Sequence, residues 1–223
     1  MKPFLSGCLG RHLCRHAPVR PPRLAGILAT LLFVGFALSG ANAQPAVPAS
    51  FDFDTSPDTV VLSYTEKHAL LPNDVPPLLR VYGDGRVHVH IPPYMKQAGD
   101  YEYHLAPGEL RALMIFIGSM GVTEFDEGTA IADRNAAEVA IFEQTGELFH
   151  VSDETVTQIE LNLANYRAPG LSGAIANFNK QVRWANLDID VTRYPQLTDL
   201  KNLHAVVTRI RAILRDPELR LVK

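Results

Sequence analysis

The chain has 223 residues, of which 47% are hydrophobic and 20% are charged, and its formal net charge is −3. This balance is typical of a globular protein. It excludes a disordered tail protein, a collagen-like repeat and a membrane protein with many spans.

The first 43 residues differ sharply from the rest. Residues 1–23 contain five basic and no acidic residues, residues 24–40 form an uncharged apolar run of 17 residues, and Ala41-Asn42-Ala43 follows. A basic flank, an apolar core and an Ala-x-Ala site are the three parts of a secretory signal peptide. We therefore expect cleavage after Ala43 and a periplasmic or secreted protein. The alternative is an N-terminal membrane anchor, because the apolar run is close to the shortest length that spans a bilayer.

Removal of this segment changes the chemistry that is available to the chain. Residues 44–223 retain 16 basic and 24 acidic residues, a net charge of −8, and both cysteines, Cys8 and Cys14, are lost. Disulfides, thiolate catalysis and cysteine-ligated zinc are then excluded. The negative charge argues against a general nucleic-acid partner, which needs a basic surface. No stable membrane span is expected after cleavage.

The first half of the remaining chain reads mainly as strands. Residues 44–58, rich in Pro, Ser and Asp, predict a flexible linker to a single domain over 59–223; a division of this domain near residue 127 is left open. Strands are predicted at 59–66, 78–82, 86–91 and 100–105, where β-branched and aromatic residues cluster. Gly83-Asp84-Gly85 joins two of them as a tight hairpin, because glycine allows the positive φ that such turns require.

Helices and a second hairpin are predicted further along. Pro107 marks the start of a helix that stops at Gly121, and five alanines within 130–144 predict a helix that stops at Gly146. Residues 147–151 and 155–163 predict a hairpin, residues 165–180 look irregular, and a last strand is predicted within 181–190 around Trp184. Apolar residues at helical spacing over 197–214 predict a closing helix. This order favours an α+β fold, an antiparallel sheet built from hairpins with helices packed on one face.

The sharpest candidate site is a group of histidines and carboxylates. His88 and His90 are two residues apart on one predicted strand and share a face, as do Asp100, Glu102 and His104 on the next. If these strands pair, a metal site can form, and its predicted ligands are His88, His90, Glu102 and His104, a set suited to Zn²⁺ or Cu²⁺. The simpler interpretation is the solvated face of a half-exposed sheet, with no cofactor.

Motifs for nucleophilic catalysis and phosphate binding are absent. Residues 170–174 (GLSGA) lack the second glycine of G-x-S-x-G, and the chain contains no H-E-x-x-H, Walker or S-x-x-K motif. The sequence therefore favours a non-enzymatic protein, although an enzyme is left open as an alternative. It identifies no catalytic residue.

Several segments resemble an uncharacterised family of exported bacterial proteins. The likeness lies in residues 77–90 (PLLRVYGDGRVHVH), in Tyr94-Met95 and in residues 98–102 (AGDYE), with Ser152-Asp153 and Tyr194-Pro195 similar to later segments of that family. The resemblance implies a bacterial, exported α+β domain. It implies no activity, cofactor or catalytic residue.

These patterns together favour a non-enzymatic domain that binds an unidentified partner or ligand of the cell envelope. The first alternative is a zinc- or copper-binding protein that uses the histidine cluster. A third class is a subunit of an envelope assembly.

Overall fold

The computed structural model describes residues 50–68 and 76–222, all of which belong to one compact unit, Gln44–Lys223. The predictions for residues 1–49, including the signal peptide or anchor, lie outside the described residues.

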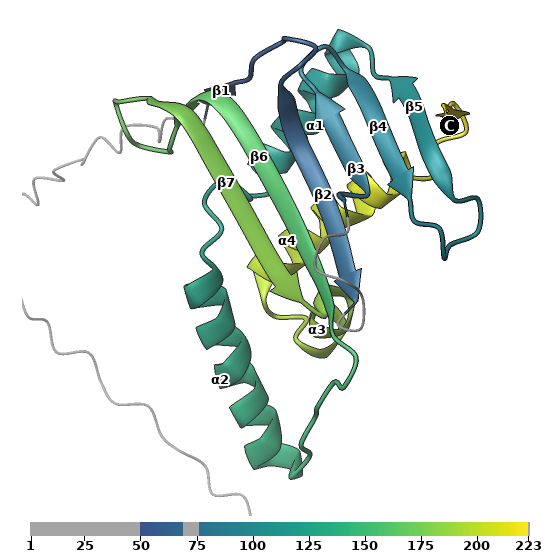
Figure 1. The fold of residues 1–223 in the computed structure, drawn as a ribbon. Coiled ribbons are helices and arrows are strands. Elements are labelled where there is room, and N and C mark those ends of the chain that lie inside the picture. Colours follow the sequence, from purple (N-terminus) through teal and green to yellow (C-terminus); the bar gives the residue numbers. More distant parts are fainter. Residues whose placement is uncertain (1–49, 69–75, 223) are drawn as a thin grey trace, which may run out of the picture. The chain divides into compact units, whose positions relative to one another are not determined.

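The described residues form eight strands and four helices (Figure 1). In chain order they are β1 (Ser50–Asp52), β2 (Val60–His68), β3 (Leu79–Tyr82), β4 (Arg86–Ile91), β5 (Gly99–His104), α1 (Pro107–Ser119), α2 (Glu127–Thr145), β6 (Thr155–Arg167), β7 (Ile175–Ala185), α3 (Leu187–Arg193), α4 (Thr198–Ile213) and β8 (Arg220–Leu221).

All the strands join one antiparallel sheet. Its order is β1-β6-β2-β3-β4-β5-β8, and β7 pairs with β6. Neighbours in sequence form the hairpins β3–β4, β4–β5 and β6–β7, whereas β2 pairs with β6 across almost a hundred residues, with Leu62 opposite Leu161. This confirms the predicted α+β class. Strands from both sides of residue 127 lie in the same sheet.

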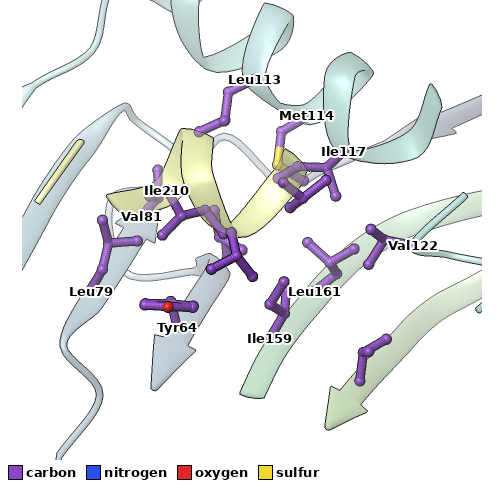
Figure 2. Packing of buried hydrophobic residues seen from close by; sticks show 14 of the residues in the cluster. Tyr64, Leu79, Val81, Leu113, Met114, Ile117, Val122, Ile159, Leu161 and Ile210 are labelled. Carbon is purple, nitrogen blue, oxygen red and sulfur yellow. The ribbon is translucent and has the colours of Figure 1, made fainter. Parts of the chain in front are cut away.

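The hydrophobic core lies between one face of this sheet and the helices α1 and α4. Period-two alternation puts Leu79 and Val81 of β3 on the same face as Ile159 and Leu161 of β6, and α4 contributes Ile210. Figure 2 shows these side chains converging, with α1 contributing its own apolar residues, Leu113, Met114 and Ile117. In Figure 1, α1 and α4 both lie behind the sheet. The opposite face of the sheet is therefore left open.

The hairpin predicted at 147–163 is wrong. Residues 146–154 form no strand, β6 runs on to Arg167, and the chain turns back through residues 168–174 to pair β6 with β7. The segment predicted to be irregular is thus mostly strand. Its alternation is hard to see because β7 lies at the edge of the sheet, where only Val182 and Trp184 are buried.

The strand predicted around Trp184 ends earlier than 190. Asn186 has a φ of +58°, and its side-chain oxygen accepts a 3.0 Å hydrogen bond from the Thr155 amide. This bond ties the end of β7 to the start of β6, and the chain then enters α3. Asparagine tolerates this left-handed conformation better than most residues, which explains the sharp change of direction.

Two segments differ from what their composition suggests: α2 is less buried, and the predicted linker is more structured. Helix α2 ends at Gly146 as predicted, but only Ala130 of its nineteen residues is buried, because alanine favours helices without offering much apolar area. Within the predicted linker, residues 50–52 form β1, and Phe51 and Phe53 pack against the core.

Candidate functional site

The face of the sheet opposite α1 and α4 carries polar side chains from six adjacent strands. We call this surface the open face. It is made of Ser63, Thr65, Lys67, Arg80, Arg86, His88, His90, Asp100, Glu102, His104, Gln158, Glu160 and Arg183 of β2–β6 and β7. None of the described helices crosses it (Figure 1). Most of its side chains are half-buried, because neighbours in register lie against one another.

The β4–β5 register brings three predicted candidates together. His90 pairs with Asp100 across the strands, and its Nδ1 lies 2.8 Å from Oδ1 of Asp100. Nε2 of His88 lies 3.5 Å from the same oxygen. Two imidazoles thus converge on one carboxylate oxygen, and each is about three-quarters buried. Nδ1 of His88 is buried, and it has no hydrogen-bond partner in the described part of the chain.

The other two predicted metal ligands are engaged elsewhere. Glu102 lies 3.7 Å from the guanidinium of Arg86, which also stacks 3.7 Å from the centroid of the Tyr82 ring. Nδ1 of His104 lies 2.9 Å from the carbonyl oxygen of Leu105.

The four predicted metal ligands therefore share the open face but divide between different contacts. Asp100, rather than Glu102, is the carboxylate that both His88 and His90 approach. Across residues 50–68 and 76–222, no group of three or more histidines and carboxylates is arranged to hold a metal ion. The ligand set stays a prediction.

Arg80 is a residue of the open face that the sequence interpretation missed. It stands between Ser63 of β2 and His88 of β4 in the register of the sheet. Among the residues that the structure describes, no carboxylate or carbonyl accepts a hydrogen bond from its guanidinium, in contrast to Arg86. The signal was available: once the Gly83–Gly85 turn fixes the hairpin, alternation places Arg80 opposite His88.

The open face differs in charge from the rest of the folded unit. It carries four basic residues (Lys67, Arg80, Arg86 and Arg183) and three acidic ones (Asp100, Glu102 and Glu160), whereas residues 44–223 carry −8 in total. Arg86 and Glu102 offset each other. Within residues 50–68 and 76–222, Arg80 is the cation at the centre of this face that has no carboxylate partner.

A hollow of about 720 Å³ lies away from the open face, between β1 and α1. Its walls are mainly apolar, with Phe51 and Phe53 on one side and Ile115 on the other, and Arg111 and Glu124 also line it. Sequence patterns gave no indication of it, because its two walls are sixty residues apart. It gathers no catalytic combination of side chains.

The comparisons with known proteins found no relative of this chain. No protein-family model matches it, and neither the curated proteins nor the solved structures contain a match. In the described part of the chain, none of the helices has the length and apolar character that crossing a bilayer requires.

Proposed function

We propose that this protein is an exported binding domain of the bacterial cell envelope that takes an anionic ligand on the open face of its sheet. The ligand chemistry is a carboxylate or phosphate group presented by an envelope polymer. Export rests on the three-part N-terminal pattern, and the site rests on Arg80.

The Arg80 guanidinium, which has no partner among the described residues, is the observation that carries this proposal. It is half-buried in the middle of a sheet face, where a charge without a partner is poorly solvated. An incoming oxyanion would accept its N–H groups and form charge-assisted hydrogen bonds, worth about 1.5–3 kcal/mol each. Ser63 lies beside it, but its hydroxyl already donates a 3.3 Å hydrogen bond to Oε2 of Glu160, so the guanidinium is the main donor that this position offers to a ligand.

The histidines next to Arg80 support the same ligand class. His88 lies beside it in register, and His88 and His90 share the carboxylate of Asp100. An imidazole beside a guanidinium can donate a further N–H to an anion. The negative charge of the rest of the unit would confine anion binding to this patch.

A binding measurement with a matched control tests the proposal. The purified protein is titrated with fluorescein-labelled polyglutamate and polyphosphate, with neutral dextran as the blank, and anisotropy is recorded. We expect Arg80→Ala to weaken anion binding at least tenfold, which corresponds to about 1.4 kcal/mol. Arg167→Ala, which removes an exposed arginine at the end of β6, should bind like the wild type. Equal affinities of the two variants would contradict the proposal.

The second candidate is a zinc- or copper-binding protein, favoured by the convergence of His88 and His90 on Asp100. A metal ion would displace the imidazole–carboxylate contact and use the same atoms as ligands. Isothermal titration with Zn²⁺ and Cu²⁺ separates this candidate from the first one. Metal binding that is lost in His88→Ala with His90→Ala, and kept in Arg80→Ala, would favour the metal protein.

A further inference from the structure

Helix α2 presents an apolar stripe that the fold does not use. Ile131, Val139 and Phe142 are 49%, 55% and 44% exposed, and their spacing puts them within one quarter of the helix circumference. Leu148 and Phe149, in the segment that follows, are also exposed. We call these five residues, with the acidic residues Glu143 and Glu147 beside them, the α2 surface.

The fold holds α2 through a different side of the helix. Arg134 lies 3.5 Å from Asp190 of α3, and Arg193 donates two hydrogen bonds, of 2.9 and 3.1 Å, to Glu138. Ala130 is the buried residue of this side. The helix is thus attached mainly by polar bonds, and it lies along the β7 edge of the sheet rather than over the core (Figure 1). Phe149 takes part in this attachment, with the Arg193 guanidinium 4.4 Å from its ring centroid, whereas Ile131, Val139 and Phe142 stay largely exposed.

An apolar stripe exposed in this way is unusual for a helix of nineteen residues. Helices in proteins take most of their stability from burying one apolar face. Contiguous apolar surface on an otherwise polar exterior commonly marks an interaction site. The stripe therefore points to a partner.

Charge identifies the kind of partner. Residues 126–154 contain eight acidic residues and one basic residue, Arg134, a net charge of −7 out of the −8 of residues 44–223. A second copy of this chain would bring an equal negative charge to the same surface and would be repelled. In a partner segment that has lysine or arginine beside apolar residues, the apolar side chains could cover the stripe and the cations could pair with the acidic residues beside it.

We propose that the α2 surface binds a basic amphipathic helix of a partner protein. The apolar residues of that helix would cover Ile131, Val139 and Phe142, and its cations would lie against Glu143 and Glu147. In recognition of this type, apolar residues at helical spacing on the partner helix dock against an apolar groove or helix face. The proposal is independent of anion binding at Arg80, which lies on another surface.

The test uses a defined probe, a fluorescein-labelled 18-residue amphipathic peptide of leucine and lysine. A peptide with the same apolar pattern and glutamate in place of lysine is the charge control. Binding of both to the full-length protein is followed by anisotropy at low and physiological salt. We expect the lysine peptide to bind, with weaker binding as salt rises, and the glutamate peptide not to bind.

Variants decide whether the α2 surface is the site. Val139→Ser with Phe142→Ser should weaken binding of the lysine peptide at least tenfold, and Glu143→Lys with Glu147→Lys should do so as well. Ile175→Ser, which changes a residue that is 50% exposed on β7, should leave affinity unchanged. Because the changed side chains are exposed, circular dichroism and the melting temperature should stay as in the wild type.

Three results would overturn the proposal. One is unchanged affinity in both α2 variants, and another is equal binding of the glutamate peptide. The third is a dimer in sedimentation equilibrium that dissociates in Val139→Ser with Phe142→Ser, which would assign the stripe to a second copy of the chain. Arg80→Ala should bind the lysine peptide normally, so failure here is distinguishable from failure of the proposed function.

Discussion

The indole N–H of Trp184 donates a 2.9 Å hydrogen bond to Oδ2 of Asp190, a carboxylate that is only 2% exposed. Nε of Arg134 lies 3.5 Å from the same oxygen. Burial raises the pKa of Asp190, while the hydrogen bond from Trp184 and the charge of Arg134 act in the opposite direction. One buried carboxylate therefore joins β7, α3 and α2.

Replacement of Asp190 should separate its hydrogen-bonding role from its charge. Asp190→Ala leaves the Trp184 N–H without an acceptor, so we expect the free energy of unfolding to fall by about 1–3 kcal/mol. Asp190→Asn keeps an acceptor without a buried charge and should stay within about 1 kcal/mol of the wild type. Urea unfolding at pH 7 measures both. Asp133→Ala, which changes an exposed residue of α2, is the control; a loss as large as that of Asp190→Ala would contradict this account.

The attachment of α2 should weaken in acid through Glu138. Hydrogen bonds from Arg193 and Tyr194 lower the pKa of Glu138 to about 2, from an ordinary value of 4.5. Since the folded pKa lies below the unfolded one, the stabilisation is complete above about pH 4.5 and is lost as pH falls toward 2.

The measurement is the difference in unfolding free energy between the wild type and Glu138→Gln. It should be constant from pH 7 to about 5 and should shrink at lower pH. Glu143→Gln, on the same helix, removes a carboxylate that no arginine contacts in the described structure, and it should change the unfolding free energy by less than about 0.5 kcal/mol at pH 7. A gap for Glu138→Gln that widens in acid would show that the sign is wrong.

Two glycines should respond to alanine in opposite directions. A Cβ on Gly83 would lie 1.9 Å from the carbonyl oxygen of Asp54, whereas one on Gly108 would meet nothing within 4 Å. Gly83→Ala should therefore cost about 3 kcal/mol or more, because the backbone of the β3–β4 turn must move. Gly108→Ala, in the first turn of α1, should add about 0.5–1 kcal/mol by restricting the unfolded chain. Melting temperatures that shift in the same direction would refute the contrast.

Local signals made part of this fold predictable. The β3–β4 hairpin was confirmed because its turn glycines and its alternation lie within fourteen consecutive residues, and Gly85 does adopt a positive φ of 97°. The same period of two placed His88, His90 and the carboxylates of β5 on one face. What alternation cannot supply is the rotamer of each side chain. Asp100 therefore lies at both imidazoles, while Glu102 turns to Arg86.

The sequence-based predictions were incomplete or wrong where paired strands are far apart in the sequence or where a strand is exposed. The β2–β6 pairing joins segments about a hundred residues apart, and no pattern within either strand identifies the strand that pairs with it. The first part of β7 was missed because Asn177 and Asn179 are exposed on an edge strand, so its apolar alternation is interrupted. The role of α2 was also missed, because alanine content predicts a helix but says nothing about what covers it.

Arg211 of α4 provides a last test, because it joins three elements through charge. Its guanidinium donates hydrogen bonds to Glu66 of β2 and, at 2.8 Å, to Oδ1 of Asp188 of α3. The bond to Asp188 lowers the pKa of that carboxyl. We expect Arg211→Ala to cost about 1–3 kcal/mol, since Glu66 is left half-buried without its cation, and Arg211→Lys to recover only part, because an ammonium cannot reproduce the forked contact.

Salt and a matched variant complete this test. Arg209→Ala removes an exposed arginine from the same helix and should change the unfolding free energy by less than about 0.5 kcal/mol. Because the ion pairs of Arg211 are partly shielded from solvent, the gap between the Arg211 and Arg209 variants should persist in 1 M NaCl. If the gap closes in salt, or if Arg209→Ala costs as much, Arg211 does not join α4 to β2 and α3, and apolar packing alone holds α4 in place.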